Sequence, residues 1–385
     1  MGATVDLMEY VASELNTKRY VIAVFIDLQK AFDTVNINFL LRKLYKMGFQ
    51  GTCYNLLKTY SKGRRHYTVV NGEKSEEEKV RTGVAQGSVL GPLLYLMYVH
   101  SLKCAELEEK YFKFADDTVL VYSGESEIQL EETVNRDLKL YFDWLCYNKL
   151  SLNVQKTVFM VIRHKGGPPC NPQIKINDSN IKRVTEYKYL GLTIADNLSW
   201  DKHIESVTNK IVPMVGSISR CAHQLNEKSR QLLYNGFIET HLRYLMPCWG
   251  NTSVGQLNRL QRLQNKAIKV LFGMNYYIAS VEIYKKVPFL KIDELKILEQ
   301  TKLIHDIQSN NLKTNIKLQQ NSQYHTYHTR TNNALRNAYV RTKTGQDSPI
   351  YRSVQAYNNI PQEVFQGSSK SVYLNLNKYI RENRK

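Results

Sequence analysis

The stretch Lys110-Tyr-Phe-Lys-Phe-Ala-Asp-Asp-Thr-Val-Leu-Val-Tyr122 carries two adjacent carboxylates, Asp116 and Asp117, between runs of aromatic and β-branched residues. This pattern predicts two short strands joined by a tight turn, with the acidic pair at its tip. Adjacent carboxylates on an apolar hairpin repel each other, so a hard divalent cation with oxygen ligands is a natural compensating charge. A solvated, Asp-rich turn explains the tetrapeptide equally well, because Asp is common in turns.

A second carboxylate upstream favours the metal-binding interpretation. The apolar run Tyr20-Val-Ile-Ala-Val-Phe-Ile26 is followed by Asp27, as expected for a buried strand that delivers a charge at its end. Two such strands side by side would hold two Mg²⁺ ions about 3.5–4 Å apart, for an in-line phosphoryl displacement. The alternative is that Asp27 only ends a strand or caps a helix, which is common for Asp.

Three segments resemble, in order, successive palm motifs of a reverse transcriptase: Phe25-Ile-Asp-Leu-Gln-Lys-Ala-Phe-Asp33, Gly83-Val-Ala-Gln-Gly-Ser-Val-Leu-Gly-Pro92 and Phe114-Ala-Asp-Asp117. Their order and spacing are similar to those of non-LTR (LINE-type), jockey-like retrotransposon polymerases. The resemblance is strong over residues 20–195 and weak beyond. It implies an RNA-directed DNA polymerase, a nucleotidyltransferase that adds dNTPs to a primer 3′-hydroxyl with two Mg²⁺ ions.

The resemblance implies that the catalytic carboxylates and metal ligands are Asp27, Asp116 and Asp117, with the carbonyl of Leu28 as a further oxygen donor. It also implies that the ring of Phe32 lies under the sugar and excludes a 2′-hydroxyl, which selects deoxynucleotides. By residue type alone, Phe32 would be an ordinary core side chain. An aromatic at this position disfavours a template-directed RNA polymerase, since ribonucleotides need room for the 2′-hydroxyl.

Further nucleotide contacts that the resemblance implies are Gln86 and Gly87, with Ser88 in the same loop, and Lys156, whose cation would stabilise charge on the leaving group. By sequence alone, Lys156 is an exposed lysine in a strand predicted over 150–161. Residues 189–191 (Tyr189, Leu190 and Gly191) resemble a primer-gripping hairpin. A strand glycine at a bulge is the ordinary alternative for Gly191.

The charge balance predicts a polyanionic partner. The chain has 53 Lys and Arg against 35 Asp and Glu, a net charge of +18, and nucleic acid is the leading candidate. The predicted helix 254–272 is strongly basic. In a chain of this charge we expect it to contact phosphates rather than only solvent, through a set of four cations: Arg259, Arg262, Lys266 and Lys269.

The resemblance implies an RNA template, a DNA primer and dNTPs as partners, and we expect no membrane. No apolar run reaches the roughly 18 residues of a membrane-spanning helix. The start of the chain lacks the basic-then-apolar pattern of a secretory signal. Six scattered cysteines without a CxxC pair fit a reducing compartment, so we expect an intracellular location, nuclear and cytoplasmic.

Apolar periodicity and turn signals predict helices over 4–16, 37–47, 51–61, 93–102, 126–147, 201–221, 227–244, 254–272 and 370–381. A strand is predicted over 187–194, and a hairpin over 64–81 with an Asn71-Gly72 turn. The polar composition of 310–347 predicts loop or partial disorder.

The predicted fold class is α+β: a reverse-transcriptase palm, with an antiparallel sheet and flanking helices, then a mostly helical thumb-like region. We expect a partial palm over 1–195, a helical thumb or connection over 196–305, and a polar, partly irregular region with a terminal helix over 306–385. Only 26 residues precede Asp27, so we expect an N-terminally truncated enzyme whose fingers are largely missing. A catalytically inactive nucleic-acid-binding remnant is the alternative function.

Overall fold

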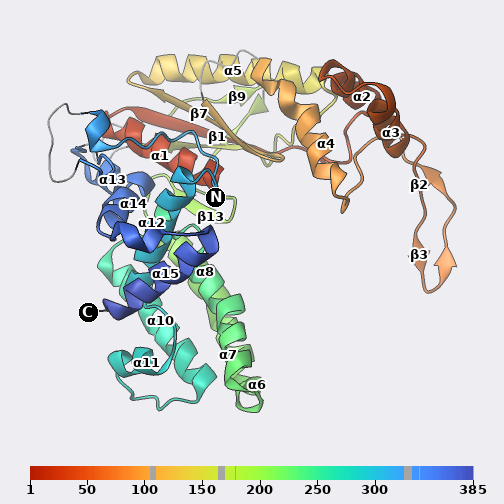
Figure 1. The fold of residues 1–385 in the computed structure, drawn as a ribbon. Coiled ribbons are helices and arrows are strands. Elements are labelled where there is room, and N and C mark those ends of the chain that lie inside the picture. The colour runs from red at the N-terminus through yellow and green to blue at the C-terminus, as the bar shows by residue number, and fades with distance from the viewer. Residues whose placement is uncertain (105–109, 164–169, 178, 325–331, 338, 385) are drawn as a thin grey trace. The chain divides into compact units, whose positions relative to one another are not determined.

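The computed structural model describes residues 1–104, 110–163, 170–177, 179–324, 332–337 and 339–384 (Figure 1). The chain forms two compact units. The sheet unit comprises Tyr20–Ile162 and Gly166–Thr185, and the helical unit comprises Met1–Arg19, Arg163–Lys165 and Glu186–Lys385. Helices around a central sheet confirm the predicted mixture of helix and strand.

The central sheet of the sheet unit has five strands in the order β11-β8-β1-β7-β6. Their bounds are β1 Tyr20–Ile26, β6 Lys110–Phe114, β7 Asp117–Gly124, β8 Val158–Ile162 and β11 Lys182–Arg183. The pairs β6–β7, β7–β1 and β1–β8 are antiparallel, as predicted, whereas β11 runs parallel to β8. The central strand β1 is therefore bonded along both edges, which suits its continuous run of buried apolar residues.

Three helices contribute buried side chains to the core on one face of this sheet: α2 (Ile37–Lys46), α4 (Leu90–Val99) and α5 (Glu127–Tyr147). Ile22, Val24 and Ile26 alternate along β1 and share one hydrophobic core with buried residues of these helices. Figure 1 shows α5 lying along the sheet beside β7. A 3₁₀ turn, His100–Cys104, follows α4. The predicted helices at 37–47, 93–102 and 126–147 are thus confirmed to within a few residues.

The remaining elements of the sheet unit are one helix and several two-residue strands. They are α3 (Gly51–Ser61), β2 (Arg65–His66), β3 (Val69–Val70), β4 (Glu73–Lys74), β5 (Glu78–Lys79), β9 (Lys175–Ile176) and β10 (Ser179–Asn180). β2 pairs with β5 and β3 with β4, which confirms the predicted hairpin. Asn71 and Gly72 have φ of +52° and +90°, the left-handed values that a two-residue hairpin turn requires.

The helical unit contains a small two-stranded hairpin and most of the helices. Its elements are α1 (Gly2–Asn16), β12 (Glu186–Tyr189), β13 (Leu192–Ala195), α6 (Asp201–Cys221), α7 (Glu227–Tyr234), α8 (Thr240–Arg243), α9 (Met246–Trp249), α10 (Val254–Phe272), α11 (Ser280–Lys286), α12 (Ile292–Gln308), α13 (Lys343–Gln346), α14 (Pro349–Asn358) and α15 (Ser369–Glu382), with short 3₁₀ turns at Ala222–Gln224, Asn321–Gln323 and Gln362–Phe365. None of the described helices is both long and apolar enough to cross a bilayer.

Several features of the helical unit differ from expectation, and α11 and α12 lie outside the predicted helical ranges. The predicted helix 227–244 is two helices joined by a π turn, Asn235–Glu239. The unpredicted helix α14 begins at the N-cap Ser348, whose hydroxyl accepts a hydrogen bond from the Tyr351 N–H, and Pro349 occupies its first turn. Ser-Pro is a helix-start signal that the polar composition upstream obscured.

The compact units also follow boundaries other than the predicted ones. α1 packs against α13 and α14 in the helical unit, where the Asn16 amide oxygen accepts a hydrogen bond from the Thr342 hydroxyl at 2.8 Å. The hairpin 186–195 packs on α6 in the same unit. The division into domains at 195 and 305 stays a prediction, but residues 1–19 and 186–195 lie with the helices rather than with the sheet.

Candidate active site

The strand register brings the predicted carboxylates to one end of the sheet. Ile26 at the end of β1 pairs with Thr118 in β7, so the next step of the same register sets Asp27 opposite Asp117. Residues opposite each other in an antiparallel pair project from the same face of the sheet. Asp116 lies in the turn between β6 and β7, beside Ala115, whose φ of +53° is uncommon for a residue with a side chain. The hairpin predicted from the acidic tetrapeptide is confirmed.

The negative charges of Asp27, Asp116 and Asp117 lie close together at this strand end. Burial, followed by the negative charges of Asp116 and Asp27, raises the pKa of Asp117. In the described part of the chain, no group of three or more His, Cys, Asp or Glu side chains that could hold a metal ion is present. The register therefore aligns the three backbones without gathering the three carboxylates around one point.

The segment that precedes β8 runs along the other side of Asp27. The Asn153 N–H donates a hydrogen bond to the Asp27 carbonyl at 2.9 Å, and the Asp27 N–H donates one to the Thr157 hydroxyl at 3.3 Å. Asn153 also accepts a hydrogen bond from the Lys156 N–H, which turns the chain at 154–156. The prediction of a strand over 150–161 is wrong over 150–157, because this Asn turn delays the strand to Val158. Lys156 is exposed on the turn.

The loop that carries Gln86 is bonded to the residues that follow Asp27. The Gly83 N–H donates to the Val35 carbonyl at 2.8 Å and the Val84 N–H to the Phe32 carbonyl at 2.9 Å. A Cβ on Gly83 would lie 2.9 Å from the Asp33 backbone, and Gly83 has a φ of +87°, so only glycine fits there. The Gln86 side-chain amide donates to the Asp33 carboxylate at 2.7 Å.

Phe32 is stacked on an aromatic residue of α4. The ring centroids of Phe32 and Tyr95 are 4.5 Å apart. Tyr95 is fully buried, and its hydroxyl has no hydrogen-bond partner among the described residues. Burial and the nearby groups Tyr141 and Asp116 raise the pKa of Tyr95. Phe32 is therefore a half-buried ring supported from below by a rigid side chain, rather than a core residue.

Sequence reasoning named the carboxylates but missed three residues that hold this region in place. Asn153, Thr157 and Tyr95 were not among the predicted site residues. Thr157 is a fully buried polar residue directly before a buried strand, and that combination is a signal for a hydrogen-bonding role. Nothing in the sequence alone marks Tyr95, because its contact with Phe32 joins two segments far apart in the chain.

The predicted primer-gripping residues belong to the helical unit. Tyr189 pairs with Leu192 across the hairpin β12–β13, and the two turn residues Leu190 and Gly191 have φ of +45° and +85°. The strand predicted over 187–194 is therefore two strands with a tight turn. The Tyr244 hydroxyl donates a hydrogen bond to the Leu190 carbonyl at 2.7 Å, and a ring carbon of Tyr244 would lie 3.0 Å from a Cβ on Gly191. This ring fixes the hairpin tip and requires glycine there.

The predicted basic helix is confirmed as α10. Its apolar side is buried, whereas Arg259, Arg262 and Lys266 are exposed and Lys269 is half-buried. These four residues recur every three or four positions, so they lie along one face of the helix. We call them the basic stripe.

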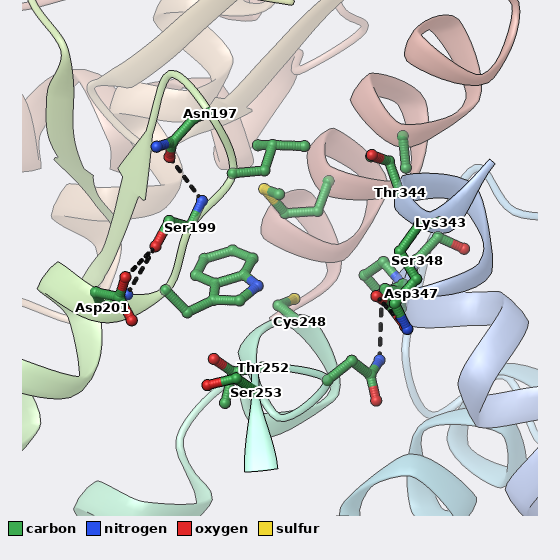
Figure 2. Close-up of a pocket in the computed structure, with 16 residues that line it drawn as sticks. Asn197, Ser199, Asp201, Cys248, Thr252, Ser253, Lys343, Thr344, Asp347 and Ser348 are labelled. Atoms are coloured by element: carbon green, nitrogen blue, oxygen red, sulfur yellow. Dashed lines mark hydrogen bonds and ion pairs between the residues drawn. The ribbon is translucent and has the colours of Figure 1, made fainter. Parts of the chain in front are cut away.

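A cavity of about 310 Å³ also lies in the helical unit, and it holds none of the predicted site residues (Figure 2). Its charged groups already have partners: Asp201 accepts a hydrogen bond from the Ser199 hydroxyl at 2.7 Å, and Lys343 pairs with Asp347 at 2.9 Å. A well-formed pocket is a usual place to seek an active site. In this chain the predicted catalytic carboxylates lie instead on an open strand end.

Comparison with known proteins gives relatives over most of the chain. It is 26% identical over 298 residues to "Probable RNA-directed DNA polymerase from transposon BS" of Drosophila melanogaster, covering 75% of this chain and 33% of that protein. It is 26% identical over 306 residues to "RNA-directed DNA polymerase from mobile element jockey" of the same species, covering 76% and 33%. The chain thus spans about a third of the length of these curated relatives.

A third relative is "Retrovirus-related Pol polyprotein from type-1 retrotransposable element R1" of Bradysia coprophila, 29% identical over 264 residues, covering 65% of this chain and 26% of that protein. Residues 2–194 match the family described as "Reverse transcriptase (RNA-dependent DNA polymerase)", which covers half of the chain and includes all three motifs. The chain therefore belongs to the reverse transcriptase family, and its relatives confirm the jockey-like, non-LTR resemblance that the motifs predicted.

Proposed function

We propose that this chain catalyses RNA-directed DNA synthesis, adding dNTPs to the 3′-hydroxyl of a primer paired with an RNA template. The observation that carries the proposal is the β1–β7 register, which continues to set Asp27 opposite Asp117 beside the Asp116 turn. The family and the polymerase names of the relatives support the same activity. In this proposal the sheet unit acts as the palm and the helical unit contains the thumb.

The donor chemistry at this strand end fits two Mg²⁺ ions, held by Asp27, Asp116 and Asp117. Three carboxylates supply the oxygen ligands that Mg²⁺ prefers. The raised pKa of Asp117 reflects burial first and then repulsion from Asp116 and Asp27, and a cation would relieve that repulsion. In this proposal, the short Asp side chains rotate when the ions bind and bring together carboxylates whose backbones already adjoin. When bound, such ions activate the attacking hydroxyl and stabilise charge on the phosphoryl group.

The Leu28 carbonyl is a further ligand in this proposal, supported by the backbone pattern. Both backbone groups of Asp27 bond to the segment 153–157, on the β8 side of β1. Backbone groups of successive residues in a strand point to opposite sides, so the Leu28 carbonyl points to the β7 side, where Asp116 and Asp117 lie.

We assign the nucleotide to the surface formed by Phe32, Gln86, Gly87 and Lys156. Phe32 would face the sugar and reject a 2′-hydroxyl, and its stacking on Tyr95 keeps the ring from moving aside. The backbone bonds between 32–35 and 83–84 fix the Gln86 loop against Phe32. Lys156, exposed on a turn bonded to the Asp27 backbone, would offer its cation to the triphosphate.

In the helical unit, the rigid hairpin tip 189–191 would contact the primer, and the basic stripe would contact template or primer phosphates. A net charge of +18 supports such contacts. An intracellular location, nuclear and cytoplasmic, remains part of the proposal.

Primer extension tests this function directly. Each assay contains an RNA template, a DNA primer, dNTPs and Mg²⁺. It compares the wild-type chain with Asp116→Ala and with the exposed control Asp143→Asn on α5. We expect extension by the wild type and the control and none by Asp116→Ala. Equal extension by all three would reject the proposal, and salt-sensitive RNA binding with no extension by any of them would establish the inactive remnant instead.

A further inference from the structure

Two adjacent tyrosines project into solvent just after α10. Tyr276 is 76% exposed and Tyr277 is 89% exposed, among the highest values for large apolar side chains in the described residues. Exposed aromatic rings next to cations are a common feature of nucleic-acid-binding surfaces, because bases stack on them. Nothing in the three polymerase motifs accounts for this pair.

The loop that carries these tyrosines is held in place by hydrogen bonds. Gly273 ends α10 with a φ of +61°, and the Met274 N–H donates to the Lys269 carbonyl at 2.9 Å. The Tyr277 N–H donates to the Asn275 side chain at 2.9 Å, and the Ile278 N–H donates to the Asn275 carbonyl at 3.2 Å. A ring presented on such a loop loses little conformational freedom when a ligand stacks on it.

One member of the basic stripe joins the stripe to the tyrosine pair. The Lys269 ammonium donates to the Tyr276 carbonyl at 2.7 Å and lies 5.6 Å from the Tyr276 ring centroid. Tyr276 in turn meets Tyr277 edge to face, with centroids 5.4 Å apart and planes at 89°. Tyr276 is thus a support fixed by the last cation of the stripe, and Tyr277 is the ring that remains open to a ligand.

The surroundings of Tyr277 suit a base and its phosphate. An open hollow of about 790 Å³ beside it is lined by Arg230, Lys286 and the carboxylate of Glu227, together with the loop itself. Ligand pockets usually measure about 300–1,000 Å³. From Arg259 to Lys269 the stripe rises about 15 Å along α10, toward the tyrosine loop.

We propose that this loop is a binding site for single-stranded nucleic acid, in which a base stacks on Tyr277 while the adjoining phosphates lie along the basic stripe. A single strand is the ligand that fits, because the bases of a duplex are stacked on one another and offer no free face except at an end. The inference rests on the proposed contact between α10 and phosphates, and it adds the base platform and the preference for a single strand.

Binding measurements separate this site from catalysis. Fluorescence anisotropy in EDTA, without dNTPs, compares a short unstructured labelled RNA with the blunt duplex of the same sequence. The variants are Tyr277→Ala, Tyr277→Phe, Lys266→Gln and Tyr339→Ala, the last a control at a tyrosine that is also 89% exposed in the same unit. Because no chemistry takes place, the result is independent of whether the chain polymerises, and Asp116→Ala should bind like the wild type.

We expect Tyr277→Ala to weaken single-strand binding at least about fivefold and duplex binding by less than about twofold, without changing the slope of log K against log salt. Tyr277→Phe should bind normally, because the stacking ring is kept. Lys266→Gln should weaken the binding of both ligands and reduce the slope by about one.

Equal losses of binding for both ligands, no loss for either, or the same loss in Tyr339→Ala would overturn the inference. If the wild type formed a dimer, and Tyr277→Ala dissociated it while leaving single-strand binding unchanged, the tyrosine pair would be a protein–protein contact instead.

Discussion

The candidate site of the sheet unit is acidic, whereas the candidate site of the helical unit is basic. In the sheet unit, acidic residues lie at the end of a fully bonded central strand, and the loops beside them are tied to it by backbone hydrogen bonds. In the helical unit, cations and exposed aromatic rings lie on a helix face and on the loop that follows it. The contrast indicates that positioning for chemistry and grip on nucleic acid are separable within one chain, so substitutions in one unit should spare the property of the other.

The largest effect is expected from Asp27→Asn. This variant should lose at least about a thousandfold in extension rate, because an amide replaces a carboxylate in the proposed metal site, and metal ions contribute several kcal/mol to the reaction. Its affinity for RNA should stay within about twofold of wild type. Steady-state extension measures the rate, and fluorescence anisotropy on the same sample measures the affinity for RNA. A parallel loss of RNA binding would show that the two properties are not separable between the units.

Acid should weaken the helical unit through His203. Its Nδ1 accepts a hydrogen bond from the Thr193 N–H at 3.3 Å, and burial, followed by the charge of Lys210, lowers the pKa of His203 to about 4. Below the ordinary value of about 6.5 the unfolded chain binds a proton that the folded chain refuses, so stability falls as pH drops from 6.5 toward 4. The loss should reach about 3 kcal/mol.

Melting curves of wild type and His203→Gln across this pH range measure that contribution as a difference. The two should diverge progressively below pH 6.5, with the wild type losing more stability, while RNA extension by the two at pH 7.5 is the same. Parallel pH profiles would show that His203 is not buried in its neutral form.

Phe32→Val should change which nucleotide is accepted more than how fast it is added. Removing the ring should raise ribonucleotide incorporation relative to dNTP incorporation by about tenfold or more, because the 2′-hydroxyl gains room. Phe39→Val, at another half-buried phenylalanine of the same unit, serves as the control for general loosening. An unchanged ratio in Phe32→Val would mean that the ring supports the loop and does not select the sugar.

The smallest effect is expected from Arg262→Gln in the basic stripe. Loss of one phosphate contact should weaken RNA and duplex binding alike, by a few-fold at low salt, and reduce the salt slope by about one. Extension at saturating primer–template should be unaffected. A lower maximal rate with an unchanged salt slope would place this residue in the chemistry of the sheet unit.

Features of both units could be predicted from the sequence where they depend on neighbouring residues. The hairpin at Asp116 and the strand before Asp27 were predictable, because a continuous apolar run and a tight acidic turn are local signals. The Asn71-Gly72 turn and the basic face of α10 were predictable for the same reason. Each depends on residues close together in the chain.

What escaped prediction depends on contacts between distant segments. The turn that presents Lys156 is formed by Asn153 bonding both to Asp27 and to its own loop, and periodicity alone extends the strand through it. The place of α1 among the C-terminal helices rests on contacts such as Asn16 with Thr342, which no local pattern indicates. The Tyr244 contact with the 189–191 turn is of the same kind.

The central claim is that Asp27 and Asp117 share a cation at the end of β1 and β7, and the Mg²⁺ dependence of thermal stability tests it most directly. We predict that Mg²⁺ raises the Tm of the wild type reversibly, that Asp27→Asn with Asp117→Asn abolishes this rise, and that the double variant is more stable than wild type in EDTA because the repulsion is gone. An equal rise in Tm with Mg²⁺ for wild type and double variant would contradict the claim.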